Sequence, residues 1–232
     1  MKKSKYLDIK EIFNLATQQH QKNDLRAANE LYDKVLKIDP NHLMAHHNLG
    51  ILFQSLGDIQ KAKKSYEKAI EVNPSHTNSY YNLGVVYQGL GDVQKAKECY
   101  EKVIKIDSNH APAQGNLARI LTELGENQKA KECYEKVIKI DPNNIGALNN
   151  LGTVFQLLDD EQNAISSYER ALKLNPNYVL THENIANLFI GSLDSSDKAI
   201  SASHKALKMF NESSKFTNQS IPLFKLKHDV EQ

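Results

Sequence analysis

Six asparagines recur at a regular spacing of about 34 residues, and their side chains suit the recognition of a polypeptide backbone: Asn14, Asn48, Asn82, Asn116, Asn150 and Asn184. One carboxamide offers an acceptor and two donors, so it can bond both the N–H and the C=O of a peptide unit beside it. In a helix, asparagine costs ~0.5–0.7 kcal/mol relative to alanine. This series, the asparagine ladder, predicts binding of the main chain of an extended polypeptide. Hydrogen bonding between helices explains the same residues equally well.

The asparagine spacing belongs to a repeat that fills most of the chain. The segment Gln94–Asp107 recurs letter for letter at Gln128–Asp141, 34 residues later. Self-similarity at such an interval indicates a stacked repeat architecture. The six copies cover 205 of the 232 residues, and the last is one residue longer: 9–42, 43–76, 77–110, 111–144, 145–178 and 179–213.

Each copy, numbered from position 1 to 34, has the pattern of two helices. Positions 4, 7, 8 and 11 form one helical stripe, and positions 20, 24 and 27 form a second. Gly57-Asp58 and Gly91-Asp92 divide the stripes, since glycine ends a helix and aspartate starts the next. Proline at position 32 closes the second helix in most copies. Small residues at positions 8 and 20 predict close packing of the two helices.

This pattern resembles the tetratricopeptide repeat, a helix-turn-helix unit of about 34 residues. The resemblance implies an all-α, right-handed α-solenoid of six tandem repeats whose first helices line a concave wall. The sixth copy, 179–213, is degenerate because it lacks the tyrosine and proline of the others. Residues 214–232 are interpreted as a C-terminal capping segment or the start of a further region.

The asparagine ladder is similar to that of the O-linked N-acetylglucosamine transferases, whose repeats hold extended polypeptide. The resemblance implies that neighbouring wall positions also contact a peptide: His47, Tyr81, Arg119, Gln54 and Gln88. Arg119 has a second interpretation, an i, i+4 ion pair with Glu123, which the spacing favours. Co-chaperones of this family bind a C-terminal carboxylate through basic residues at positions 2, 5 or 6 of neighbouring repeats. In this chain only Lys10 is a basic residue of that kind, so binding of a terminal carboxylate is not expected.

Several classes of function are not expected from composition and motifs. The net charge of +1 argues against a nucleic-acid partner, and no apolar run reaches the ~18 residues of a membrane span. Cys99 and Cys133 predict passive packing in a reduced, cytoplasmic setting, and no N-terminal leader is recognised. His42, His46 and His47 form the one histidine cluster, but His42 ends the preceding connection and His46 occupies the position-4 packing site, so no metal is expected. No phosphate loop or nucleophile motif occurs, and neither a cofactor nor a catalytic residue is predicted.

Three functions remain for a chain of this kind. The first is a non-catalytic protein–protein interaction scaffold that binds an extended peptide through the asparagine ladder. The second is the substrate-recruiting region of a larger enzyme such as a glycosyltransferase. The third is self-association through the concave groove.

Overall fold

The computed structural model describes residues 8–191, and these residues form helices joined by short turns. The helices are α1 (Ile9–Gln21), α2 (Leu25–Ile38), α3 (Leu43–Ser55), α4 (Ile59–Val72), α5 (Thr77–Gly89), α6 (Val93–Ile106), α7 (Ala111–Glu123), α8 (Asn127–Ile140), α9 (Ile145–Leu157), α10 (Glu161–Leu174) and α11 (Val179–Gly191). Of the sixth copy only α11 is described, and the predicted capping segment 214–232 lies outside the described residues.

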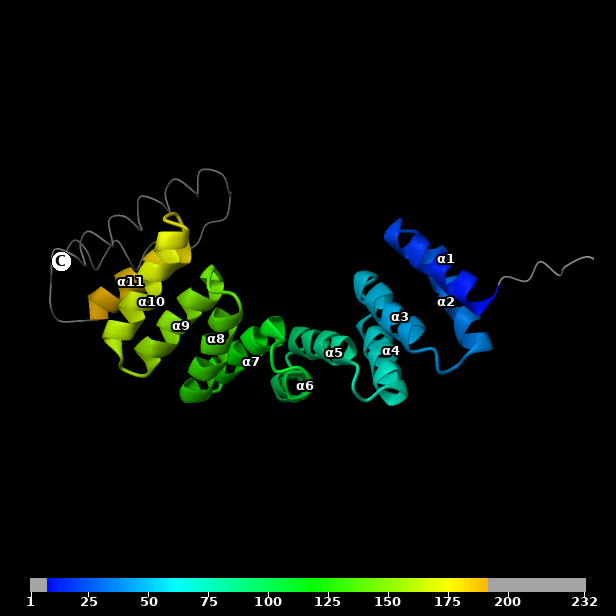
Figure 1. Cartoon of the computed structure of the whole chain (residues 1–232), viewed down its shortest axis with the longest axis horizontal. Helices are drawn as coiled ribbons and strands as arrows, with labels where there is room; N and C mark the ends of the chain where they lie inside the picture. The colour runs from blue at the N-terminus through cyan, green and yellow to red at the C-terminus, as the bar shows by residue number, and fades with distance from the viewer. Residues whose placement is uncertain (1–7, 192–232) are drawn as a thin grey trace, which may run out of the picture. The chain divides into compact units, whose positions relative to one another are not determined.

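Helices that follow one another in the chain pack in pairs, and within a unit neighbouring pairs also pack together (Figure 1). The chain divides into two compact units, Met1–Ala113 and Gln114–Gln232, with the division inside α7. In the first unit α1 pairs with α2, α3 with α4 and α5 with α6, and α4 also contacts α5. In the second unit α9 pairs with α10 and contacts α8. The predicted all-α solenoid of helical repeats is confirmed, and no described helix is long and apolar enough to cross a membrane.

The predicted boundaries between first and second helices are confirmed. Gly57 and Gly91 both have φ of +75°, a left-handed backbone that glycine adopts without strain. The next residues, Asp58 and Asp92, accept hydrogen bonds from the backbone N–H groups of the helices that they cap. Asp159 takes the same left-handed turn at φ of +57° without glycine, as aspartate does more readily than most residues.

A fully buried tyrosine at position 24 forms the centre of most repeats, as in Tyr66 and Tyr100. The small residue at position 8 makes room for its ring. A Cβ added to Gly84 would lie 2.8 Å from Cε1 of Tyr100, too close for two carbon atoms. The small residue at position 8 is therefore required by this ring of the second helix.

Candidate functional site

The asparagine ladder contacts the buried tyrosines. Asn48 on α3 donates from Nδ2 to the hydroxyl of Tyr32 on α2, at 3.1 Å. Asn82 on α5 makes the equivalent hydrogen bond to Tyr66 on α4; burial raises the pKa of Tyr66, and this bond opposes the rise. Each partner tyrosine lies on the second helix of the preceding repeat. These two amides therefore connect consecutive repeats in the first unit.

Two of the tyrosines at position 24, Tyr66 and Tyr100, donate from their hydroxyls to glutamines at position 12. The hydroxyl of Tyr66 lies 2.9 Å from Oε1 of Gln54, and that of Tyr100 lies 3.1 Å from Oε1 of Gln88. The structure thus brings together two predicted site residues, Gln54 and Asn82, through a tyrosine that the sequence pattern indicated only as a packing residue. The tyrosines recur with the same period as the asparagines. This shared period is the signal in the sequence that could have indicated a contact between them. Nε2 of Gln88 is buried and makes no hydrogen bond.

The ladder has different neighbours in the second unit. Asn150 bonds the hydroxyl of Tyr134 and also accepts from Nδ2 of Asn149 at 3.2 Å. Asn184 donates to Oδ1 of Asn149 at 3.0 Å and to Oγ1 of Thr153 at 3.3 Å. Side-chain amides and hydroxyls next to the ladder therefore occupy more of its hydrogen-bonding capacity in this unit.

Asn14, the first member of the series, differs from the central asparagines because its side chain on α1 is exposed. Asn116 on α7 is half-buried, like Asn48 and Asn82.

The remaining predicted wall residues lie in three different environments. His47 is only 6% exposed, and its Nδ1 lies 3.1 Å from Oγ of Ser79, so its side chain is enclosed between two repeats. Tyr81 is half-buried, with its ring centroid 5.1 Å from that of His110. Arg119 is exposed, and its guanidinium lies 3.0 Å from Glu123, which confirms the favoured i, i+4 ion pair.

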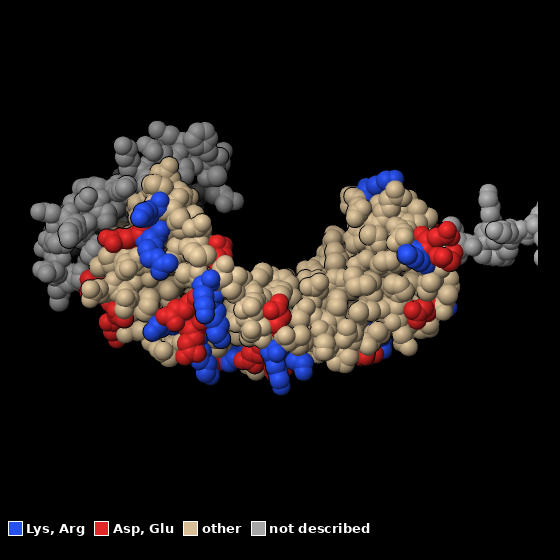
Figure 2. Space-filling view, viewed as in Figure 1, with Lys and Arg blue, Asp and Glu red and all other residues tan. Residues whose placement is uncertain are grey.

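Three of the first helices carry no Asp, Glu, Lys or Arg. These are α3, α5 and α9, whereas α4, α6 and α8 are rich in both acids and bases. The first helices α1 and α7 do carry charge, for example Lys10 on α1 and Arg119 on α7, and Figure 2 shows charged side chains over α1 as well as over second helices. Asn48, Asn82 and Asn150 therefore lie on helices without such charges, and the other members of the asparagine ladder do not.

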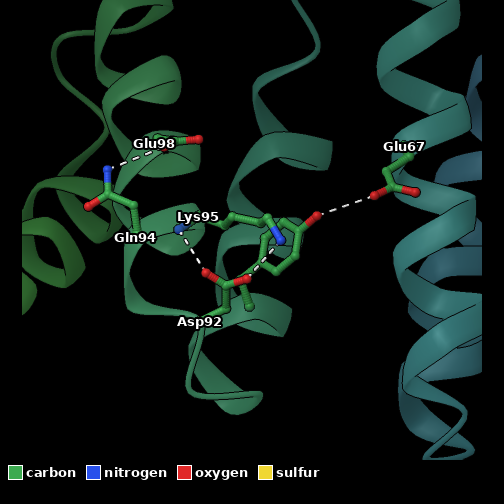
Figure 3. A network of polar contacts seen from close by, with 6 residues as sticks. Glu67, Asp92, Gln94, Lys95 and Glu98 are labelled. Atoms are coloured by element: carbon green, nitrogen blue, oxygen red, sulfur yellow. Dashed lines mark hydrogen bonds and ion pairs between the residues drawn. The ribbon is translucent and has the colours of Figure 1, made fainter.

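The charged residues of the second helices form local polar contacts. On α6, Nζ of Lys95 lies 2.9 Å from Oδ2 of Asp92 and 5.4 Å from the ring centroid of Tyr87 (Figure 3). The hydroxyl of Tyr87 on α5 donates to Glu67 on α4 at 3.2 Å. Burial, followed by the charge of Glu67, raises the pKa of Tyr87 to about 12. These contacts fasten one repeat to the next without preparing a reactive group.

The thiol of Cys99 is poorly suited to nucleophilic chemistry. Burial raises its pKa to about 12, and the carboxylate of Glu98 adds to the rise. Within residues 8–191 no three His, Cys, Asp or Glu side chains are grouped as metal ligands. The chemistry that the described site offers is hydrogen bonding by neutral amides and hydroxyls.

Solved structures of repeat proteins resemble this chain. A MamA protein is 26% identical, with a TM-score of 0.66 over 73% of this chain and 92% of its own. YrrB, described as a TPR protein with an unusual peptide-binding site, is 22% identical, with a TM-score of 0.68 over 76% and 91%. PilF of Pseudomonas aeruginosa is 15% identical, with a TM-score of 0.75 over 95% and 97%. The last two likenesses show the fold alone.

A comparison with curated proteins gave no match. The profile of the tetratricopeptide repeat family, in contrast, matches three overlapping stretches of the sequence, residues 43–109, 75–143 and 109–177. Together these stretches run from residue 43 to residue 177, more than half of the chain, and they contain helices α3–α10. The chain belongs to the tetratricopeptide repeat family.

Proposed function

We propose that this chain is a protein-interaction scaffold that binds an extended peptide along its first helices. Membership of the tetratricopeptide repeat family supports a protein-interaction role. The observation that carries the finer proposal is the pair of half-buried amides Asn48 and Asn82 on α3 and α5, two helices without Asp, Glu, Lys or Arg. The peptide-binding site ascribed to YrrB makes a peptide the first partner to test.

The two central amides of the first unit keep hydrogen-bonding capacity for a ligand. Asn48 and Asn82 each have a bond to one tyrosine hydroxyl. That bond uses one of the two donors of an amide and leaves its acceptor and second donor. The tyrosine also fixes the orientation of the amide, which lowers the entropic cost of binding. A peptide is therefore expected to bind the first unit more tightly than the second.

The spacing of the amides suits an extended chain. Neighbouring first helices in packed repeats lie on the order of 10 Å apart. An extended peptide rises about 3.3 Å per residue, so successive asparagines meet roughly every third residue. Such contacts recognise the main chain, and Tyr81 adds side-chain preference. His47 is left out of this site because it is buried.

The test is a selection of random peptides against the full chain, followed by calorimetric titration of the recovered peptides. Asn48→Ala combined with Asn82→Ala is expected to weaken binding by ~1–3 kcal/mol. Because both amides bond tyrosines, this variant also loses stability. Affinity must therefore be measured well below its melting temperature.

Tyr66→Phe is the matched control. It removes the hydrogen bond that holds Asn82 but keeps the amide, so it is expected to lower stability while peptide affinity falls less than tenfold. Equal affinity of the wild type and the double asparagine variant would reduce the ladder to a structural role. Failure to select any peptide on the wild-type chain would contradict the proposal as a whole.

A further inference from the structure

A cluster of two histidines and one serine lies where α3 meets α5 in the first unit, with His47 and Ser79 buried and His76 half-buried. Oγ of Ser79 lies 3.1 Å from Nδ1 of His47 and 2.8 Å from Nδ1 of His76. The two imidazole rings meet edge to face, with centroids 5.0 Å apart. Ser79 is fully buried and His47 nearly so. The cluster therefore forms part of the joint between two consecutive repeats.

The number of protons in the cluster limits its charge. A serine hydroxyl has one proton, so it can donate to only one of the two Nδ1 atoms, and the other Nδ1 must carry its own proton and donate to Oγ. Two neutral imidazoles satisfy this arrangement. If both rings become imidazolium, both Nδ1 atoms are donors, and the serine proton loses its acceptor in the cluster. Two positive charges would then also lie side by side in a buried joint.

The groups that pack around the cluster do not supply a balancing negative charge. From α4 the ring of Tyr66 lies 5.8 Å from that of His47, centroid to centroid, and the tyrosine is neutral because burial raises its pKa. Within α3 the adjacent His46 bonds the carbonyl oxygen of Pro40. In the part of the chain that the structure describes, no ion pair involves His47 or His76. Among the described residues, no neighbouring carboxylate therefore stabilises the protonated form of His47 or His76.

Burial lowers the pKa of His47 to about 4, and the neighbouring His76 adds to the decrease. Burial also lowers the pKa of His76. A group whose pKa is lower in the folded than in the unfolded protein stabilises the fold above its ordinary pKa of 6.5. That stabilisation is lost as the pH falls from 6.5 towards 4.

The second unit has an uncharged counterpart at the same repeat positions. Oγ1 of Thr181 on α11 donates to Oδ1 of Asn149 on α9 at 2.8 Å, and both residues are buried. Thr181 corresponds to Ser79 and Asn149 to His47, whereas Tyr178 stands where the first unit has His76. An amide and a hydroxyl do not titrate, so this pair provides an internal control.

We propose that the His47–Ser79–His76 cluster is an acid-sensitive joint, in which proton uptake separates α3 from α5 and loosens the first unit while the Asn149–Thr181 joint stays closed. The opening follows from the shared hydroxyl, since the cluster satisfies its hydrogen bonds only while at least one ring is neutral. This proposed joint does not depend on which ligand binds the first helices.

Hydrogen exchange of the full chain, followed by mass spectrometry and corrected for the intrinsic exchange rate, tests the proposal. Between pH 7.5 and pH 5, opening in peptides from α3 and α5 is expected to increase on the order of thirtyfold, and opening in peptides from α9 much less. The double variant His47→Asn, Ser79→Thr copies the pair of the second unit. Its opening in α3 and α5 is expected to change less than threefold over the same range.

The reciprocal variant, Asn149→His with Tyr178→His and Thr181→Ser, is expected to make α9 acid-sensitive. Wild-type pH dependence that persists in His47→Asn, Ser79→Thr would overturn the proposal, as would equal acid sensitivity of α3 and α9 in the wild type. Circular dichroism at pH 7.5 checks that each variant folds. Should the double variant not fold, NMR titration of His47 in the wild type decides. Titration below pH 5 supports the joint, and titration near 6.5 overturns it.

Discussion

The joints between repeats differ in chemistry between the two units, although their helices are built alike. In the first unit a ring at position 5 packs on a histidine at position 34, as Phe13 does on His42 and Tyr81 on His110, with centroids 4.8 and 5.1 Å apart. In the second unit the joint of α9 and α11 uses the amide of Asn149 instead. The repeat thus requires a common backbone and a common buried tyrosine, while position 5 remains free to vary.

This variation changes what the asparagine ladder contacts. In the first unit Asn82 bonds the hydroxyl of Tyr66, while His47 at position 5 of the preceding repeat bonds Ser79. In the second unit the amide of Asn149 lies beside the ladder, and Asn184 bonds it and Thr153. Identical residues at position 6 therefore have different partners in different repeats: Asn150 keeps a tyrosine hydroxyl, and Asn184 bonds side chains at positions 5 and 9 of the preceding repeat.

The largest expected effect tests whether the units are stabilised separately. Tyr66→Ala and Tyr168→Ala each remove a fully buried ring, at a cost of ~3–5 kcal/mol. In repeat proteins stability is a sum over repeats and their nearest interfaces, so each loss is expected in the unit that carries the variant. Hydrogen exchange at increasing urea concentration measures both units at once. Equal loss of protection in both units would show that they unfold as one.

Removal of a helix cap is expected to lower the free energy of unfolding by a smaller amount, which differs between the two units. Nδ1 of His42 and Oδ1 of Asn144 accept hydrogen bonds from the backbone at the starts of α3 and α9. Asn144→Ala is expected to cost ~1 kcal/mol. His42→Ala loses the cap and the contact with Phe13, so it is expected to cost ~1.5–2 kcal/mol. Urea unfolding at neutral pH compares the two variants. A larger cost for Asn144→Ala than for His42→Ala would contradict a stabilising contact between His42 and Phe13.

A pair of double-mutant cycles measures the change in asparagine partners. Asn82→Ala with Tyr66→Phe is expected to show a coupling energy of ~0.5–1.5 kcal/mol, because the two side chains share a hydrogen bond. Asn184→Ala with Tyr168→Phe is expected to show a smaller coupling energy, since Asn184 reaches the hydroxyl of Tyr168 only through Thr153. Four urea unfolding curves per cycle are needed. Equal coupling in both cycles would remove the distinction between the units.

The smallest effects are expected at two exposed ion pairs. Arg119 lies 3.0 Å from Glu123 in the second unit, and Arg26 lies 3.4 Å from Glu30 in the first. Arg119→Ala is expected to cost ~0.3–0.5 kcal/mol and Arg26→Ala less, because the second pair is longer and more exposed. Thermal melts at low and high salt check this order. A cost that does not fall with salt would mean that the arginine acts by packing.

Local signals determined the helices before any contact was known. The period placed each hairpin, and Gly57-Asp58 and Gly91-Asp92 marked their turns, because a left-handed glycine and a capping carboxylate act within a few residues. Asp159 takes such a turn without the glycine signal. The i, i+4 pair of Arg119 and Glu123 was also predictable, since both residues lie on one helix face.

What the sequence by itself determined is the repeat: all-α hairpins, a tyrosine at position 24 in the first five copies, and an amide at position 6 in all six. Only the tertiary structure decided that Tyr66 joins Asn82 to Gln54, and that His47 is enclosed with Ser79, 32 residues away. The physical reason is that helical periodicity specifies which face a side chain occupies. Its hydrogen-bond partner depends on how the neighbouring repeat stacks, and stacking brings together residues that no local pattern relates.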